Sequence, residues 1–192
     1  IELYKKIINE IKGFVSSVTL SIGGESFLHP KLYEMISYAS QNGIRPMINT
    51  NATLLDKDAT HFLLDSGIKH INFSFDGFNK EMYEQIRVGA DFQETLNNIL
   101  YFLNEKKNRR QKLPYTVLTI LLLNIGKYSE DEKDLFLKTF DGLVDEIRLR
   151  QPFSWGNKFK DTREFSHFQN KSIFFPCGRI WSTLAIAWNG DI

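Results

Sequence analysis

Residues 18–43 read VTLSIGGESFLHPKLYEMISYASQNG, and this stretch decides the fold. The run 18–22 is apolar and β-branched and leads into two glycines, which predicts a buried strand followed by a tight turn. From Pro30 onward, apolar residues recur at helical spacing until the Asn-Gly pair at 42–43 breaks the pattern. The stretch therefore predicts one strand followed by its crossover helix.

The same unit recurs along the chain. Further strands are predicted at Pro46–Asn49, Ile71–Phe75, Tyr115–Leu123 and Leu143–Leu149, with helices between them that Asp56, Asp91 and a Ser129/Glu132 capping box open. Alternating strands and helices indicate parallel strands joined by right-handed crossovers, as in a doubly wound sheet or a (β/α) barrel. Because a helix at 3–11 leads the series, we expect a strand upstream.

These patterns predict an α/β fold, a partial (β/α)6 TIM-like barrel truncated at its first strand. The regular pattern ends after Pro152, and a boundary is predicted near residue 170. Residues 1–170 would form the partial barrel. Residues 171–192 would begin a small auxiliary domain with a hairpin strand at Leu184–Ala187.

Composition excludes several classes of protein. The chain has 192 residues, a formal net charge of +1 and 42% hydrophobic residues, so it should fold and has no general attraction to nucleic acid. Its longest apolar run, 117–123, is far shorter than the roughly 20 residues that span a bilayer. A soluble, cytoplasmic protein is expected. The single cysteine, Cys177, cannot by itself hold an iron-sulfur cluster.

The loops after the strands are the expected ligand site, because ligands bind at the carboxyl ends of parallel strands. These loops carry Gly-Gly-Glu at 23–25, Asn-Thr-Asn-Ala-Thr at 49–53, Phe-Asp-Gly at 75–77, Asn124 and the segment 150–156. An apolar strand ending in GGESFLHP, then NTNAT, then SFDG with YEQIRVGA beyond it, resembles the radical S-adenosylmethionine superfamily in order and spacing. Pro176-Cys177, Trp181 and Asn189-Gly190 resemble the start of its SPASM auxiliary cluster domain.

The resemblance implies roles for individual residues. Gly23, Gly24 and Glu25 match the motif that binds the methionine ammonium of adenosylmethionine, and a carboxylate suits an ammonium. Ser74 matches a position that meets the methionine carboxylate or the ribose, and Arg87 an arginine that pairs with that carboxylate. Loop position further nominates Asn51, Asp76 and Asn124 for ribose or adenine contacts, and Cys177 as a ligand of an auxiliary cluster.

The sequence departs from the family pattern in three places. Ser26 stands where proline is usual, and Ala52 stands where glycine is common. The CxxxCxxC triad, which the family carries after its first strand, is missing, and we attribute this to truncation rather than to a homologue that has lost its cluster.

The implied activity is that of a radical enzyme. A 4Fe-4S cluster would reductively cleave S-adenosylmethionine, and the 5′-deoxyadenosyl radical would abstract hydrogen from a peptide or small-molecule substrate. A flavodoxin or ferredoxin would donate the electron, and no nucleic acid or membrane would take part. The resemblance fits a peptide or protein maturase or a small-molecule oxidoreductase, and allows an auxiliary 4Fe-4S cluster.

Two other functions compete with this prediction. One is a non-catalytic binding module without a cluster, and the other is a metal-independent (β/α) barrel enzyme. A Schiff-base aldolase would need a lysine within a strand, and none of the predicted strands contains one.

Simpler roles also compete at single residues. Glu25 could only cap a turn, Arg87 could pair with Glu84 along a helix, and Cys177 could be an inert small residue. The basic run 106–110 more simply complements the end of its helix.

Overall fold

A computed structural model of the chain describes residues 1–21, 23–122, 128–150 and 178–192. It divides into two compact units, residues 1–151 and 152–192. The boundary predicted near residue 170 lies outside the described residues. Within the described ranges, no helix is long and apolar enough to cross a membrane.

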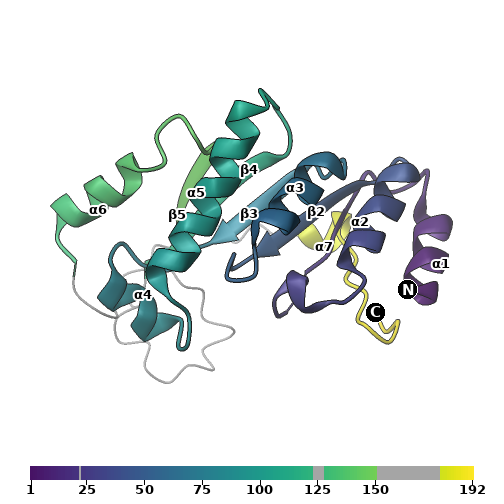
Figure 1. Cartoon of the computed structure of the whole chain (residues 1–192). Helices are drawn as coiled ribbons and strands as arrows, with labels where there is room; N and C mark the ends of the chain where they lie inside the picture. Colours follow the sequence, from purple (N-terminus) through teal and green to yellow (C-terminus); the bar gives the residue numbers. More distant parts are fainter. Residues whose placement is uncertain (22, 123–127, 151–177) are drawn as a thin grey trace, which may run out of the picture. The chain divides into compact units, whose positions relative to one another are not determined.

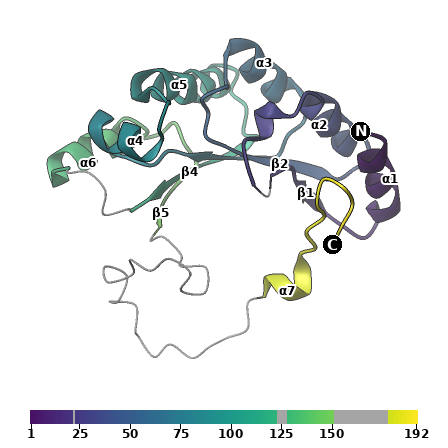
Figure 2. The same ribbon diagram turned by 90° about the horizontal axis from the view of Figure 1, so that it is seen from below.

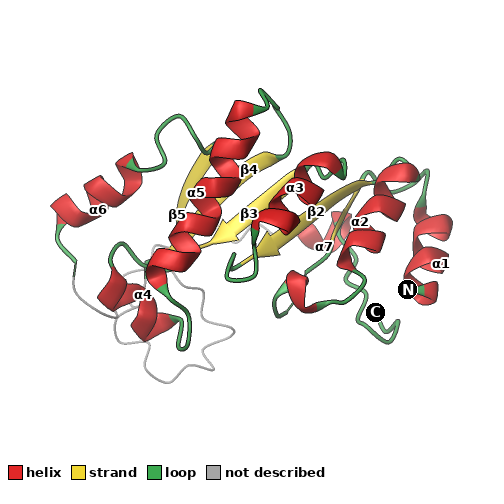
Figure 3. Ribbon diagram, in the orientation of Figure 1, coloured by secondary structure: helices red, strands yellow, loops and turns green. Residues whose placement is uncertain are grey.

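The first unit is built on a parallel sheet whose five strands lie side by side in chain order (Figure 1). The strands are β1 (Ser17–Thr19), β2 (Arg45–Thr50), β3 (His70–Ser74), β4 (Tyr115–Leu121) and β5 (Glu146–Arg150). All four pairings are parallel, which confirms the α/β fold predicted from the alternating pattern. Figure 3 shows the strands together and the helices that connect them.

Helices cover one face of this sheet (Figure 2). They are α1 (Glu2–Ile11), the short 3-10 helix η1 (Ser26–Leu28), α2 (Leu32–Gln41), α3 (Lys57–Asp65), α4 (Lys80–Ile86), α5 (Phe92–Asn108) and α6 (Glu130–Lys138). Asp56, Asp91 and Ser129 cap α3, α5 and α6 as predicted, and Glu132 completes the capping box of α6.

Side chains alternate between the two faces of the sheet. On β3, Ile71 and Phe73 are fully buried in the core under the helices. Asn72 and Ser74 therefore point to the opposite face, where Thr119 Oγ1 of β4 lies 2.6 Å from Asn72 Oδ1. The sheet has an apolar face under the helices and a face lined with polar groups.

The bounds of all five predicted strands shift by one to three residues, and the first and the last strand shift most. The first ends at Thr19 instead of Ile22, where the chain leaves the sheet for the glycine loop. The last begins at Glu146 instead of Leu143, because a turn precedes it in which the Leu143 N–H donates to the Phe140 carbonyl.

The described part of the second unit holds a short helix, α7 (Arg179–Ser182), and a turn. Leu184–Ala187 is not a strand, so that prediction was wrong within the described residues. The Ala187 N–H instead donates to the Asp191 carbonyl at 2.7 Å and closes a turn in which Gly190 has φ +95°. The turn does not bring a neighbouring strand into pairing with 184–187 within the described residues, and a segment without such pairing is not a strand.

Candidate ligand site at the carboxyl edge of the sheet

The Glu25 carboxylate joins the loop after β1 to the end of β2. Its Oε1 accepts hydrogen bonds from the Thr50 hydroxyl at 2.8 Å and the Phe27 N–H at 3.2 Å. Its Oε2 accepts one from the Asn51 N–H at 2.7 Å. Glu25 therefore does cap the turn of η1, the simpler role considered for it. Since a carboxylate offers about four acceptor positions, one remains for a ligand.

The loop itself is open. A Cβ atom at Gly23 or Gly24 would meet nothing within 4 Å, and Gly24 has φ +99°, a conformation that favours glycine. Their backbone N–H groups donate to no other described residue. The loop can therefore offer hydrogen-bond donors to a polar ligand.

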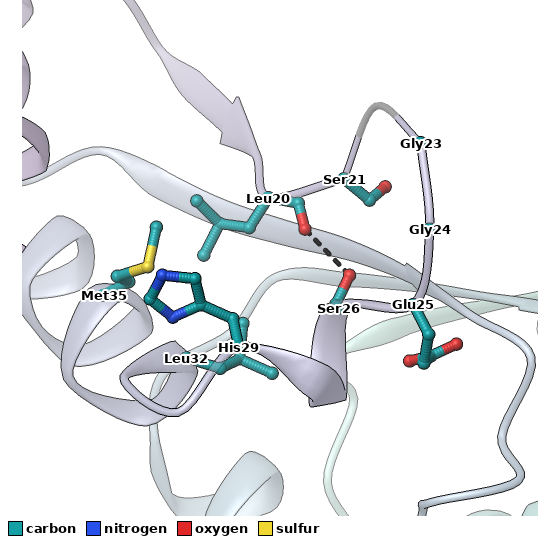
Figure 4. A pocket seen from close by; sticks show the side chains of 9 residues that line it. All are labelled: Leu20, Ser21, Gly23, Gly24, Glu25, Ser26, His29, Leu32 and Met35. Atoms are coloured by element: carbon teal, nitrogen blue, oxygen red, sulfur yellow. Dashed lines mark hydrogen bonds between the residues drawn. The ribbon is translucent and has the colours of Figure 1, made fainter. Parts of the chain in front are cut away.

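A small cavity of about 130 Å³ lies beside this loop. In Figure 4 the side chains of Leu20, Leu32 and Met35 gather on one side of the loop, whereas the Glu25 carboxylate points away from them. Small-molecule sites commonly enclose about 300–1,000 Å³, so this cavity alone is too small for a nucleoside-sized ligand. Such a ligand would have to extend over the open carboxyl edge of the sheet.

Both substituted family positions have a structural role. The buried Ser26 hydroxyl lies 2.8 Å from the Leu20 carbonyl and 3.0 Å from that of Asn49, so it ties the loop to the ends of β1 and β2. Ala52 is fully buried with φ +61°, a conformation costly for any residue but glycine. Its N–H donates to Thr50 Oγ1, which holds the strained turn.

The structure places Asn51 and Ser74 at this edge. Asn51 Oδ1 accepts from the N–H and the hydroxyl of Thr53, so this oxygen shapes its own loop. Ser74, at the last position of β3, is half-buried and forms no side-chain hydrogen bond with a described residue. Its hydroxyl is available to a ligand.

Asp76 and Arg87, predicted separately as ligand contacts, form an ion pair with each other. The Asp76 side chain is 4% exposed and also accepts a hydrogen bond from the Leu121 N–H at 3.2 Å. Arg87 therefore does not pair with Glu84, the alternative partner, which instead forms an ion pair with Lys80.

Two predicted ligands, Asn124 and Cys177, lie outside the described residues. Within the described ranges, no group of three or more metal-binding side chains comes together.

Sequence reasoning missed Thr50, which contacts both Glu25 and the Ala52 turn. A signal was present, because alternation along β2 places this polar residue on the buried face, where it is 2% exposed. Buried hydroxyls need a partner, and a carboxylate in the adjacent loop supplies one.

The first unit is thus an α/β domain with polar groups and unclaimed donors at the carboxyl edge of a parallel sheet. Residues 1–136 match the family described as the Radical SAM superfamily, and the chain belongs to this superfamily.

Individual relatives agree with this membership. The chain is 34% identical over 76 residues to Fe-coproporphyrin III synthase of Methanosarcina barkeri, which covers 40% of this chain and 19% of that protein. It is 29% identical over 158 residues to GTP 3′,8-cyclase of Alkaliphilus oremlandii, and this match covers 77% of this chain and 47% of the cyclase. Among solved structures, Streptococcus suis SuiB bound to S-adenosylmethionine matches with a TM-score of 0.61 at 15% identity, covering 80% of this chain and 34% of SuiB. The chain thus spans less than half the length of these relatives.

Proposed function

We propose that this chain is the adenosylmethionine-binding part of a radical enzyme, and that the cofactor lies across the carboxyl edge of its sheet. Superfamily membership supports radical adenosylmethionine chemistry in general. The loop at 23–25 supports this position for the cofactor. Its backbone N–H groups at Gly23 and Gly24 have no partner among the described residues, and they lie beside the Glu25 carboxylate, which Thr50 and Asn51 hold.

The residues present fit S-adenosylmethionine. Its methionine moiety offers an ammonium and a carboxylate. Glu25 has acceptor capacity left for the first, and Ser74 and Arg87 have donors for the second. When bound with a 4Fe-4S cluster, adenosylmethionine supplies a 5′-deoxyadenosyl radical that takes hydrogen from the substrate. We assign the cluster ligands to sequence outside this chain, where a CxxxCxxC triad would follow a further strand and extend the sheet toward a (β/α)6 barrel.

The polar face of the sheet is the proposed place for the substrate. Asn72, Ser74 and Thr119 lie on this face, away from the helices. Polar groups there favour a substrate with hydrogen-bonding groups, either a peptide or a small molecule. Residues from about 171 onward would begin a SPASM-type auxiliary domain that holds a second cluster through Cys177. A flavodoxin or ferredoxin in the cytoplasm would supply the electron.

The test uses the full-length protein, purified without oxygen and reconstituted with iron and sulfide. We expect reductant-dependent release of 5′-deoxyadenosine from S-adenosylmethionine. We also expect this release to be lost in Glu25→Ala and kept in Glu34→Ala, whose carboxylate is surface-exposed and pairs with Lys5. Binding of adenosylmethionine without any cleavage would contradict the radical mechanism and support a binding module.

A further inference from the structure

Asp76 is too enclosed to serve as a ligand contact. It lies two residues after the end of β3 and is 3% exposed, and its two carboxylate oxygens accept from the Leu121 N–H and the Arg87 guanidinium. Because a ligand hydroxyl needs an accessible oxygen, the earlier prediction of an Asp76 contact to ribose or adenine is not supported by this burial.

Arg87 is held differently. It stands at the carboxyl end of α4, with its backbone N–H bonded to the Tyr83 carbonyl at 2.8 Å. Its side chain is 32% exposed, and its Nε atom is buried without a hydrogen-bond partner in the described structure. A guanidinium carries five N–H donors, and the one ion pair with Asp76 leaves outer donors free for an anionic group.

The helix that carries Arg87 is fixed against the turn after Asp76. A Cβ atom added at Gly77 would lie 2.8 Å from the Tyr83 backbone nitrogen, so α4 approaches this turn as closely as glycine allows. The Tyr83 ring stacks on Phe75 at 4.4 Å between centroids. The backbone under Arg87 is therefore rigidly placed, and Asp76 fixes the direction of its side chain.

We infer that Asp76 is a positioning residue that holds the Arg87 guanidinium at the carboxyl edge, where Arg87 meets the carboxylate of the methionine moiety of adenosylmethionine. This inference rests on the proposed function. Without Asp76, the long arginine side chain would sample several rotamers in solvent and lose the orientation that a two-pronged contact needs.

The test compares two ligands in the full-length protein, reconstituted with its cluster and kept free of reductant so that adenosylmethionine is not cleaved. S-adenosylmethionine carries the methionine carboxylate, and 5′-methylthioadenosine has the same adenosine part without it. Dissociation constants are measured by equilibrium dialysis for wild type, Asp76→Asn, Arg87→Met and the double variant. The asparagine keeps the size of Asp76 and an acceptor for the Leu121 N–H, and the double variant leaves no buried charge if a single variant folds poorly.

For adenosylmethionine we expect about tenfold weaker binding in both single variants, and the double variant should be no weaker than Arg87→Met alone. Binding of 5′-methylthioadenosine should stay within about twofold of wild type.

Three results would overturn the inference. An equal loss of affinity for both ligands would mean that Asp76 acts on the adenosine part. Additive losses of affinity in the double variant would show that Asp76 and Arg87 act independently. Unchanged affinity in Asp76→Asn would mean that the ion pair serves only the structure. If the wild-type protein binds neither ligand, the proposed function itself fails, and the inference fails with it.

Discussion

Each edge of the parallel sheet holds an ion pair with one enclosed partner, and the two pairs differ in which partner is exposed: the acid at the amino edge and the base at the carboxyl edge. At the amino edge, Lys106 Nζ lies 2.5 Å from Asp145 Oδ2, which also accepts from the N–H and hydroxyl of Thr116 at 2.8 and 2.6 Å. The Lys106 side chain is 7% exposed. The Lys106 ammonium is therefore enclosed, whereas the Asp145 side chain is 32% exposed.

At the carboxyl edge, the ion pair with Asp76 leaves several N–H donors of the Arg87 guanidinium without a partner in the described structure. Arg87 is a third exposed, and within the described residues neither the Ser74 hydroxyl nor the N–H groups of Gly23 and Gly24 have a hydrogen-bond partner. Together with the proposed function, this difference assigns stability to the amino edge and binding to the carboxyl edge, which is the usual division in parallel (β/α) folds.

The largest effect is expected at the amino edge. Asp145→Ala leaves the Lys106 ammonium buried without its counter-ion, so the free energy of unfolding should fall by about 3 kcal/mol. Denaturant unfolding of the full-length protein measures this, with the exposed Lys107→Ala as control. Adenosylmethionine affinity should not change, and a large loss of affinity would break the division.

A smaller effect is expected where α4 meets the turn after β3. Gly77 has φ +153°, and an alanine there would put its Cβ 2.9 Å from Tyr83 Cα, so Gly77→Ala should cost about 2 kcal/mol and displace Arg87. Gly89→Ala is the matched control, because Gly89 also has positive φ but a Cβ there meets nothing within 4 Å. That variant should cost only about 1 kcal/mol and leave affinity intact. Equal effects from the two variants would contradict the role of close packing.

Loss of the Ser26 hydroxyl should have a smaller effect still. Ser26→Ala removes the link between the loop and the ends of β1 and β2, which should cost about 1 kcal/mol in unfolding free energy. Ser16→Ala, at an exposed position, is the control. The same stability in both variants would show that the hydroxyl does not hold the loop.

The pH dependence should show the smallest effect. Burial acts to raise the pKa of Asp145, but hydrogen bonds from Lys106 and Thr116 outweigh it, so the pKa lies below its ordinary value. A lowered pKa stabilises the fold above the unfolded-state value of about 3.9, and this contribution is lost as pH falls through the folded-state pKa. Because the side chain is about a third exposed, solvent screens part of the effect. Unfolding measured below pH 4 should show a shallower decline in Asp145→Ala than in wild type, and identical declines would contradict the assignment.

How far the sequence predicts this molecule depends on whether the signal is local. Helix caps such as Asp91 and the strand predicted at Ile71–Phe75 have local signals, and the structure confirms the cap and places that strand at His70–Ser74. The partner of Asp76 was not predicted, because Arg87 lies eleven positions away on another element and only tertiary packing brings the two together. The burial of Thr50 could have been read from the alternation along β2, but its partner could not, since the Glu25 carboxylate is 25 positions away along the chain.

The most direct test of the division measures adenosylmethionine affinity in Glu25→Gln and Asp145→Asn of the full-length protein. Glu25→Gln removes a carboxylate at the carboxyl edge and should weaken binding by at least about tenfold. Asp145→Asn removes one at the amino edge and should leave the dissociation constant within about twofold of wild type. Unchanged affinity in Glu25→Gln, or equal losses in both variants, would contradict the claim that the carboxyl edge binds the cofactor.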